Sequence, residues 1–197
     1  MGFFDVLLGR SKPVRPDLDR LFALPNAAIT LEAAAGLVPT GLGSVCFRAA
    51  EGGAFAQVER EVRELLDAGG GPRIETSTDS YGYTWLLVRR DPEQLSDLVT
   101  DLHAVNSSLE AAGFGPSLLC SLVGFTGPAG AETAESARRS LALVYLYKRG
   151  TFYPFAPLPG QKRDSALELQ VRGAVGADLP VEEDLSRWFP VWGAPGL

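Results

Sequence analysis

Residues 73–90, RIETSTDSYGYTWLLVRR, decide the fold of this chain. β-Branched and polar residues run into a polar turn at residues 78–80, and the chain returns through alternating aromatic residues into an apolar run. This pattern is typical of a β-hairpin, because β-branched and aromatic side chains favour strands and short polar segments favour tight turns. We therefore expect a hairpin, with Tyr81, Tyr83 and Trp85 on one face of a sheet.

The segment after this hairpin predicts a long amphipathic helix. Asp91 suits the N-cap, Pro92 the first helical position and Gln94 the third, and Gly113 suits the end of the helix. The apolar residues that recur at helical spacing are Leu95, Leu98, Val99, Leu102, Val105 and Leu109. We expect this stripe to pack on the sheet to which the hairpin belongs.

The remaining sequence predicts further helices and strands around this centre. Helices are expected over residues 17–24 (closed by Pro25), over 55–66 and from Asp164 onward, and strands over 28–32, 43–48, 117–125 and on both sides of a turn at Arg149 and Gly150. Pro154 marks the last strand as an edge strand. The elements do not alternate strictly as β-α-β, so we predict an α+β single domain over residues 16–197, with a mainly antiparallel sheet and packed helices. It ends in a Trp/Pro-rich tail over residues 177–197 and follows an N-terminal segment, residues 1–15.

The composition indicates which kinds of partner and which cellular compartment suit this protein. A formal net charge of −6 and a pI near 4.9 argue against a nucleic-acid partner, because the surface lacks a broad basic field. Cys46 and Cys120 lie in apolar runs with no metal-ligand spacing, so we expect free thiols in the cytoplasm and no metal or cofactor site. The sequence contains no run of about 18 apolar residues, which a membrane-spanning helix would need.

The N-terminal segment, MGFFDVLLGRSKPVR, combines apolar and basic residues. A helix this short is marginal in water, so it must dock on its own domain, on another protein or at a membrane interface. Basic residues beside apolar ones favour anionic lipid surfaces. The residues we expect to make a partner or membrane contact are Phe3, Phe4, Leu7, Leu8, Arg10 and Lys12.

Candidate catalytic residues are few, and a structural interpretation is favoured for each. His103, the only histidine, falls at the boundary of the helical stripe, and no nucleophile motif accompanies it. Asn106 falls inside the stripe, where a buried amide needs hydrogen-bond partners on a neighbouring strand or loop. The run GLGSVC at residues 41–46 indicates a turn, and the acidic residues 182–184 could cap a short helix before Trp188.

Tyr81, Tyr83 and Trp85 allow several interpretations. They could stack bases of single-stranded nucleic acid, but this acidic chain offers no cationic groove for the backbone. Packing under a helix or under the C-terminal tail is favoured, because large aromatic side chains are usually buried. A surface that binds an extended peptide is the alternative that we retain for these three residues.

Several long stretches resemble the PspA-associated protein PspAB family. They are the start of the chain (residues 1–34), GSVCFR at 43–48, YGYTWLLVRR at 81–90, YLYKRGTFYPFAP at 145–157 and DLSRWFPVWG at 184–193. The resemblance implies a small accessory protein linked with PspA, a coiled-coil membrane-stress protein of the phage shock response, and implies no catalytic residues. The order of helices and strands is also similar to YbjN-type and secretion-chaperone-like domains.

Together these observations predict a non-enzymatic adaptor in an envelope-stress response. We expect it to contact PspA or a companion protein and to be either wholly cytoplasmic or peripheral at the inner face of the plasma membrane. The alternative is a chaperone-like peptide-binding module around Tyr81, Tyr83 and Trp85. A small hydrolase built around His103 ranks last.

Overall fold

The computed structural model describes residues 16–48, 74–127 and 139–197, together with Gln57, Arg60, Val62 and Glu64. Its centre is a six-stranded sheet with strand order β2-β3-β1-β4-β5-β6, in which every neighbouring pair is antiparallel. The strands are β1 (Val38–Arg48), β2 (Glu75–Thr78), β3 (Tyr83–Arg89), β4 (Leu118–Thr126), β5 (Ser140–Leu146) and β6 (Thr151–Phe155). A second, two-stranded sheet joins β7 (Pro157–Leu158) to β8 (Lys162–Arg163). The predicted α+β class is confirmed.

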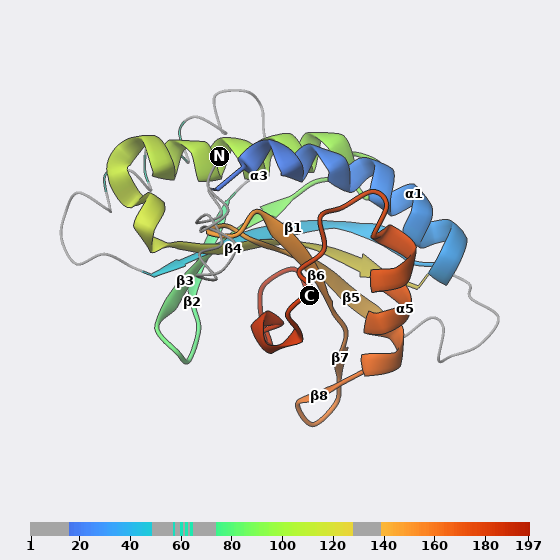
Figure 1. Ribbon diagram of the computed structural model, residues 1–197. Helices are drawn as coiled ribbons and strands as arrows, with labels where there is room; N and C mark the ends of the chain where they lie inside the picture. Colours follow the sequence, from blue (N-terminus) through green and yellow to red (C-terminus); the bar gives the residue numbers. More distant parts are fainter. Residues whose placement is uncertain are drawn as a thin grey trace, which may run out of the picture.

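The regular helices cover one face of the large sheet and one of its ends (Figure 1). They are α1 (Leu24–Ala35), preceded by the 3-10 turn η1 (Leu18–Ala23), α3 (Leu95–Leu109) and α5 (Ser165–Val175). The helix α3 continues into the short turns η2 (Glu110–Phe114) and η3 (Gly115–Ser117). Gly113, at φ 87°, ends the run of helical backbone as expected.

Strand periodicity divides the interior into two apolar layers. In β5, Leu141, Leu143 and Tyr145 face the helices, whereas Ala142 and Val144 face the opposite side. The helix-side layer contains the predicted stripe of α3, and Val62 from the predicted helix over residues 55–66 is also buried there. The opposite layer lies between the sheet and the C-terminal tail, so both faces of the sheet are covered in part.

Two predictions near the start of the chain are wrong. The strand expected over residues 28–32 belongs to α1, and Pro25 lies in the first turn of that helix instead of closing the one before it. Proline suits a first turn because N–H groups there have no acceptor within the helix, so a residue without an N–H loses no hydrogen bond. Its φ is also already helical. Leu24, Ala27, Ala28 and Leu31 have the spacing of a buried helical face, and this pattern outweighs the strand propensity of Ile29 and Thr30.

The beginnings of two other elements also differ from expectation. Helix α3 starts at Leu95 with Gln94 as N-cap, because residues 91–94 form a turn in which the Gln94 N–H donates to the Asp91 carbonyl at 2.8 Å. The run GLGSVC is not a turn but lies wholly within β1, whose pairing with β4 shifts register between Pro39 and Gly43.

The tail packs back onto its own sheet. Its residues 180–182 cover the outer edge of β6, where Phe152 donates to the Pro180 carbonyl at 2.8 Å and accepts from the Glu182 N–H at 2.7 Å. Trp188 stacks on Tyr153 with ring centroids 6.0 Å apart, and Trp192 meets the ring of Phe155 at 4.8 Å. The strand that carries Pro154 is the last of the sheet, as predicted, but its edge is already occupied at Phe152.

Candidate functional site

A row of side chains across four strands forms the floor of an apolar pocket. Trp85 on β3 pairs with Cys46 on β1, Cys46 with Cys120 on β4, and Cys120 with Leu146 on β5. Residues that are direct partners in neighbouring strands point to the same face of a sheet. The four side chains therefore form one line on the face that bears the C-terminal tail, and all four line the pocket.

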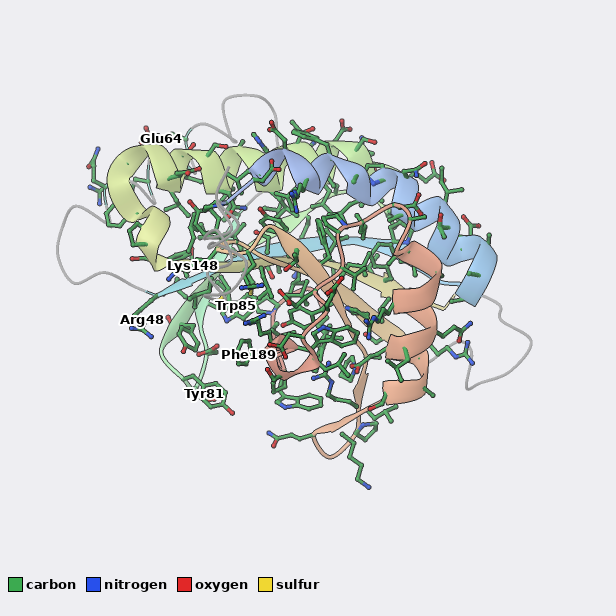
Figure 2. All side chains as sticks on the ribbon, viewed as in Figure 1. Arg48, Glu64, Tyr81, Trp85, Lys148 and Phe189 are labelled. Carbon is green, nitrogen blue, oxygen red and sulfur yellow. The ribbon has the colours of Figure 1, made fainter. Side chains whose placement is uncertain are left out.

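The walls of the pocket come from the hairpin and the tail. Tyr81 and Tyr83 lie at the tip of the β2–β3 hairpin, Leu119 and Tyr153 border the floor, and residues 189–192 form the opposite wall. The cavity measures about 480 Å³, within the usual range of ligand-binding pockets. Tyr81 is 72% exposed and Phe189 59% exposed, so the aromatic rim is open to solvent (Figure 2).

Asp79 fixes the hairpin wall, and among the described residues that line the pocket it is the only carboxylate and none is Lys or Arg. Its Oδ1 accepts from the backbone N–H groups of Tyr81 (2.9 Å) and Tyr83 (3.0 Å), and its Oδ2 accepts from Trp85 Nε1 (3.0 Å). Burial alone would raise the pKa of the Asp79 carboxyl, but these three donors together lower that pKa below its ordinary value. The pocket therefore presents one negative charge at neutral pH.

Cys46 and Cys120 are both free and buried at the centre of the floor. The hydrogen bond with the Cys120 thiol, followed by burial, raises the pKa of the Cys46 thiol far above its ordinary range. A thiol that remains protonated is a poor nucleophile. The arrangement thus indicates a packing role for Cys46 in the floor of the pocket.

This proposed packing role predicts low thiol reactivity. In a Cys120→Ser variant, which leaves Cys46 as the only thiol, we expect the reaction with DTNB at pH 8 to be at least about 100-fold slower in native protein than after unfolding in urea. Absorbance at 412 nm measures the rate, and the Cys46→Ser variant shows whether Cys120 behaves in the same way. Equal rates in the folded and unfolded states would contradict a buried, protonated Cys46.

The comparisons with known proteins identify the family. A family model described as PspA associated protein B matches residues 1–196. The chain belongs to the PspAB family. No curated protein and no solved structure matches this family member, so the expected likeness to YbjN-type and secretion-chaperone-like domains is not confirmed.

The structure brings together the three aromatic residues predicted as a possible binding surface in this PspAB protein. Tyr83 and Trp85 belong to the tail-side layer, and Trp85 is 4% exposed, so the expectation of packing under the tail describes Trp85 well. Tyr81 lies in the turn before β3 and not on the strand, yet it lines the same pocket. Sequence reasoning did not place Cys46, Asp79 or residues 189–192 beside them.

The predicted N-terminal contact residues lie outside the described residues. They are Phe3, Phe4, Leu7, Leu8, Arg10 and Lys12. Within the described ranges, no helix has the length and apolar character needed to cross a bilayer. The described side chains also contain no group of three or more His, Cys, Asp or Glu residues that could hold a metal ion.

His103 occupies the half-buried boundary position predicted for it on α3. Its Nε2 lies 3.2 Å from Asp19 Oδ1, its Nδ1 lies 3.4 Å from Ser107 Oγ, and its ring packs on Phe22. His103 lines neither the aromatic pocket nor the smaller cavities beside Lys148 and Arg163. These contacts hold η1 against α3, so they give His103 a structural role.

Asn106 and the acidic residues 182–184 also have structural contacts. The Asn106 amide is fully buried and donates to the Leu102 carbonyl of its own helix and to Ser121 Oγ on β4, both at 2.8 Å. Asp184 caps the 3-10 turn η4 (Leu185–Arg187), as predicted for this acidic run. Glu182 was expected to act in the same way, but it is buried and binds Arg149 and Thr151.

Proposed function

We propose that this PspAB family member is a non-enzymatic adaptor that binds PspA or a companion protein during an envelope-stress response. Family membership supports a PspA-associated role. The open aromatic pocket, with Tyr81 and Phe189 exposed at its rim, is the observation that supports protein binding at this surface. Exposed aromatic side chains around a pocket are typical of protein contact sites, where a few anchors supply most of the affinity.

In this proposal the pocket binds an apolar segment of the protein partner. Its floor offers only side chains, and the main-chain edge of β6 is covered by the tail at Phe152. Side-chain insertion into the pocket is therefore favoured over the addition of a strand at β6. The adaptor would act in the cytoplasm, and residues 1–15, when they are free, would contact the partner or the inner face of the plasma membrane.

A Tyr81→Ala substitution tests the pocket as the partner site. Tyr81 is mostly exposed, so the variant is expected to fold normally and to bind purified PspA at least about tenfold more weakly, which corresponds to about 1.4 kcal/mol. Phe22→Ala is the matched control, because Phe22 is an exposed aromatic residue on η1, which packs on the helix side of the sheet. Isothermal titration calorimetry measures both affinities.

Two outcomes would contradict this proposal. Tyr81→Ala could bind PspA as tightly as wild type, or Phe22→Ala could lose as much affinity as Tyr81→Ala. Flotation with anionic vesicles, comparing the full chain with one that lacks residues 1–15, separates membrane contact from protein contact. Flotation that depends on these residues, without any PspA binding, would replace the protein partner by a lipid surface.

The second candidate function, a chaperone-like peptide-binding module, uses the same pocket. The observation that favours it is the size of the cavity together with its single charged group, which would suit segments from more than one protein. A panel of unrelated apolar peptides distinguishes the two functions. Comparable affinity for several peptides supports the chaperone-like module, whereas selective binding of one PspA segment supports the adaptor.

A further inference from the structure

We propose that the N-terminal segment, residues 1–15 of the same molecule, docks into the aromatic pocket and competes there with the protein partner. This inference rests on the proposed use of the pocket as a binding site. It names the occupant of the pocket in the free protein and thereby a means of regulation. Four properties of the pocket and of the segment support it: size, charge, position and reach.

The size of the pocket matches the apolar part of the segment. A cavity of about 150 Å³ holds a benzene ring, and the pocket measures about 480 Å³. It therefore has room for more than one large side chain. Within residues 1–15, Phe3, Phe4, Leu7 and Leu8 supply such side chains, and water is a poor environment for them.

The charges of the two parts are complementary. The described lining of the pocket carries one carboxylate, Asp79, and no cationic side chain. The segment carries three cations, Arg10, Lys12 and Arg15, and one carboxylate, Asp5, although the whole chain has a net charge of −6. Asp79 Oδ1 accepts two hydrogen bonds from the hairpin and Oδ2 accepts one, so Oδ2 can accept another. A cation over the exposed ring of Tyr81 would also gain cation–π attraction.

The described chain begins at the same end of β4 and β5 as the pocket, on the helix side of the sheet. Pro16 lines a neighbouring cavity of about 340 Å³ together with Pro116 and Tyr147. Leu146, which directly precedes Tyr147, and Leu119, three residues after Pro116, line the aromatic pocket on the opposite face of the sheet. The Tyr147 N–H donates to the Leu119 carbonyl at 3.1 Å, so the two cavities lie at the same end of these strands.

The start of the described chain is also held in place at this end of the sheet. The Tyr145 hydroxyl donates to the Asp17 carbonyl at 2.8 Å and accepts from the Asp17 N–H at 3.3 Å. Fifteen residues precede Pro16, and an extended chain of that length spans about 50 Å. A domain of about 180 residues has a radius of gyration of only about 16 Å. The segment can therefore reach the pocket of its own molecule.

Tethering favours the intramolecular contact. A short linker gives an effective concentration in the millimolar range. If the free peptide binds the pocket with a Kd of about 100 μM, the tethered segment would occupy the pocket about 90% of the time. A partner would then have to bind about tenfold more tightly than to a free pocket in order to compete equally.

Tryptophan fluorescence provides the test, because all three tryptophans, Trp85, Trp188 and Trp192, belong to the tail-side layer. We compare acrylamide quenching in the full chain and in a full-length Phe3→Ser/Phe4→Ser variant. The variant is expected to show a Stern–Volmer constant about twofold larger, because Trp192 and the pocket become more accessible. Addition of the peptide MGFFDVLLGRSKPVR to the variant should restore the smaller constant, whereas the same peptide with both phenylalanines replaced by serine should not.

The position of the contact is tested with a second pair of full-length variants. Tyr81→Ala is expected to weaken binding of the free peptide at least about fivefold, and Phe22→Ala is expected to leave it unchanged. Equal quenching in wild type and in the Phe3→Ser/Phe4→Ser variant, with no peptide binding up to 1 mM, would overturn the inference. A quenching difference that depends on protein concentration would also overturn it, since the segment would then bind a second copy.

A failure of the intramolecular contact can be distinguished from a failure of the proposed function. Affinity for PspA is measured on the same variants, and release of the segment is expected to raise it about tenfold. If PspA binds normally but the segment neither protects the tryptophans nor changes that affinity, only the intramolecular contact is wrong. If the segment protects the tryptophans but PspA does not bind, only the proposed partner is wrong.

Discussion

A Glu182→Gln substitution is expected to lower the free energy of unfolding by about 3 kcal/mol, because it breaks a buried charged network. Glu182 Oε2 accepts from Arg149 Nε at 2.6 Å and from Thr151 Oγ1 at 2.9 Å. Its Oε1 accepts from the Asp184 N–H at 3.2 Å and from Arg187 Nη1 at 3.3 Å. Both oxygens of Glu182 accept hydrogen bonds, so the NH2 group of a glutamine would face other donors. The tail would then be held less firmly on β6.

The same network predicts a pH dependence. Burial alone would raise the pKa of Glu182, but hydrogen bonds from Arg149, Thr151 and the Asp184 backbone outweigh burial and lower that pKa below its ordinary value. The folded pKa then lies below the unfolded one. The stability that this group contributes is therefore present above about pH 4.3 and is lost as the pH falls through the folded pKa.

Urea unfolding at several pH values measures both effects. The difference in unfolding free energy between wild type and Glu182→Gln is expected to be largest near pH 7 and to shrink below about pH 4. Glu183→Gln is the matched control, because Glu183 is exposed, and its effect should stay within about 0.5 kcal/mol. If the two variants were equally stable at pH 7, Glu182 would have no role in anchoring the tail.

A Gly43→Val substitution is expected to destabilise the protein by about 3 kcal/mol or more, through overpacking between α3 and the sheet. A Cβ at residue 43 would lie 2.8 Å from Leu102 Cδ1, 3.1 Å from the Leu122 carbonyl oxygen and 3.3 Å from Leu98 Cδ1. The leucines are fully buried and the carbonyl belongs to β4, so the helix would have to move away from β1. Strand propensity alone would favour valine here, and packing reverses that preference.

Gly173→Ala is the matched control for this prediction. Gly173 lies within α5, is exposed, and has no atom within 4 Å of an added Cβ. Alanine should therefore stabilise the protein by about 0.5–1 kcal/mol, because it restricts the unfolded chain and favours helix. Thermal unfolding followed by circular dichroism should show the two midpoints shifting in opposite directions. A midpoint for Gly43→Val at or above that of wild type would contradict the close packing of α3 on β1.

Local patterns were sufficient for most elements of the fold. The 73–90 hairpin, the buried stripe of α3 and the strands β4, β5 and β6 form where the spacing of apolar residues predicts them. The errors occurred where one residue type suits two structures. Pro25 suits both the end of one helix and the first turn of the next, and a residue propensity cannot separate these possibilities.

The candidate site could be predicted only in part. Tyr81, Tyr83 and Trp85 were identified together because they are close in sequence and alternate. Cys46, Cys120 and Leu146 join Trp85 only through strand order and register, which sequence reasoning could not fix. The acidic run 182–184 predicts only a cap role for Glu182, because its partners Arg149 and Thr151 are more than 30 residues away along the chain.

The sequence by itself determined the α+β class, the helical and strand segments and the likeness to the PspAB family, because each of these depends on neighbouring residues or on ordered stretches of the chain. Tertiary structure alone decided that the tail closes the second face of the sheet and that an aromatic pocket with one carboxylate remains beside it. The pocket unites side chains from six separate parts of the chain. Contacts of this kind depend on how strands pair and how loops cross the sheet, so no local pattern encodes them.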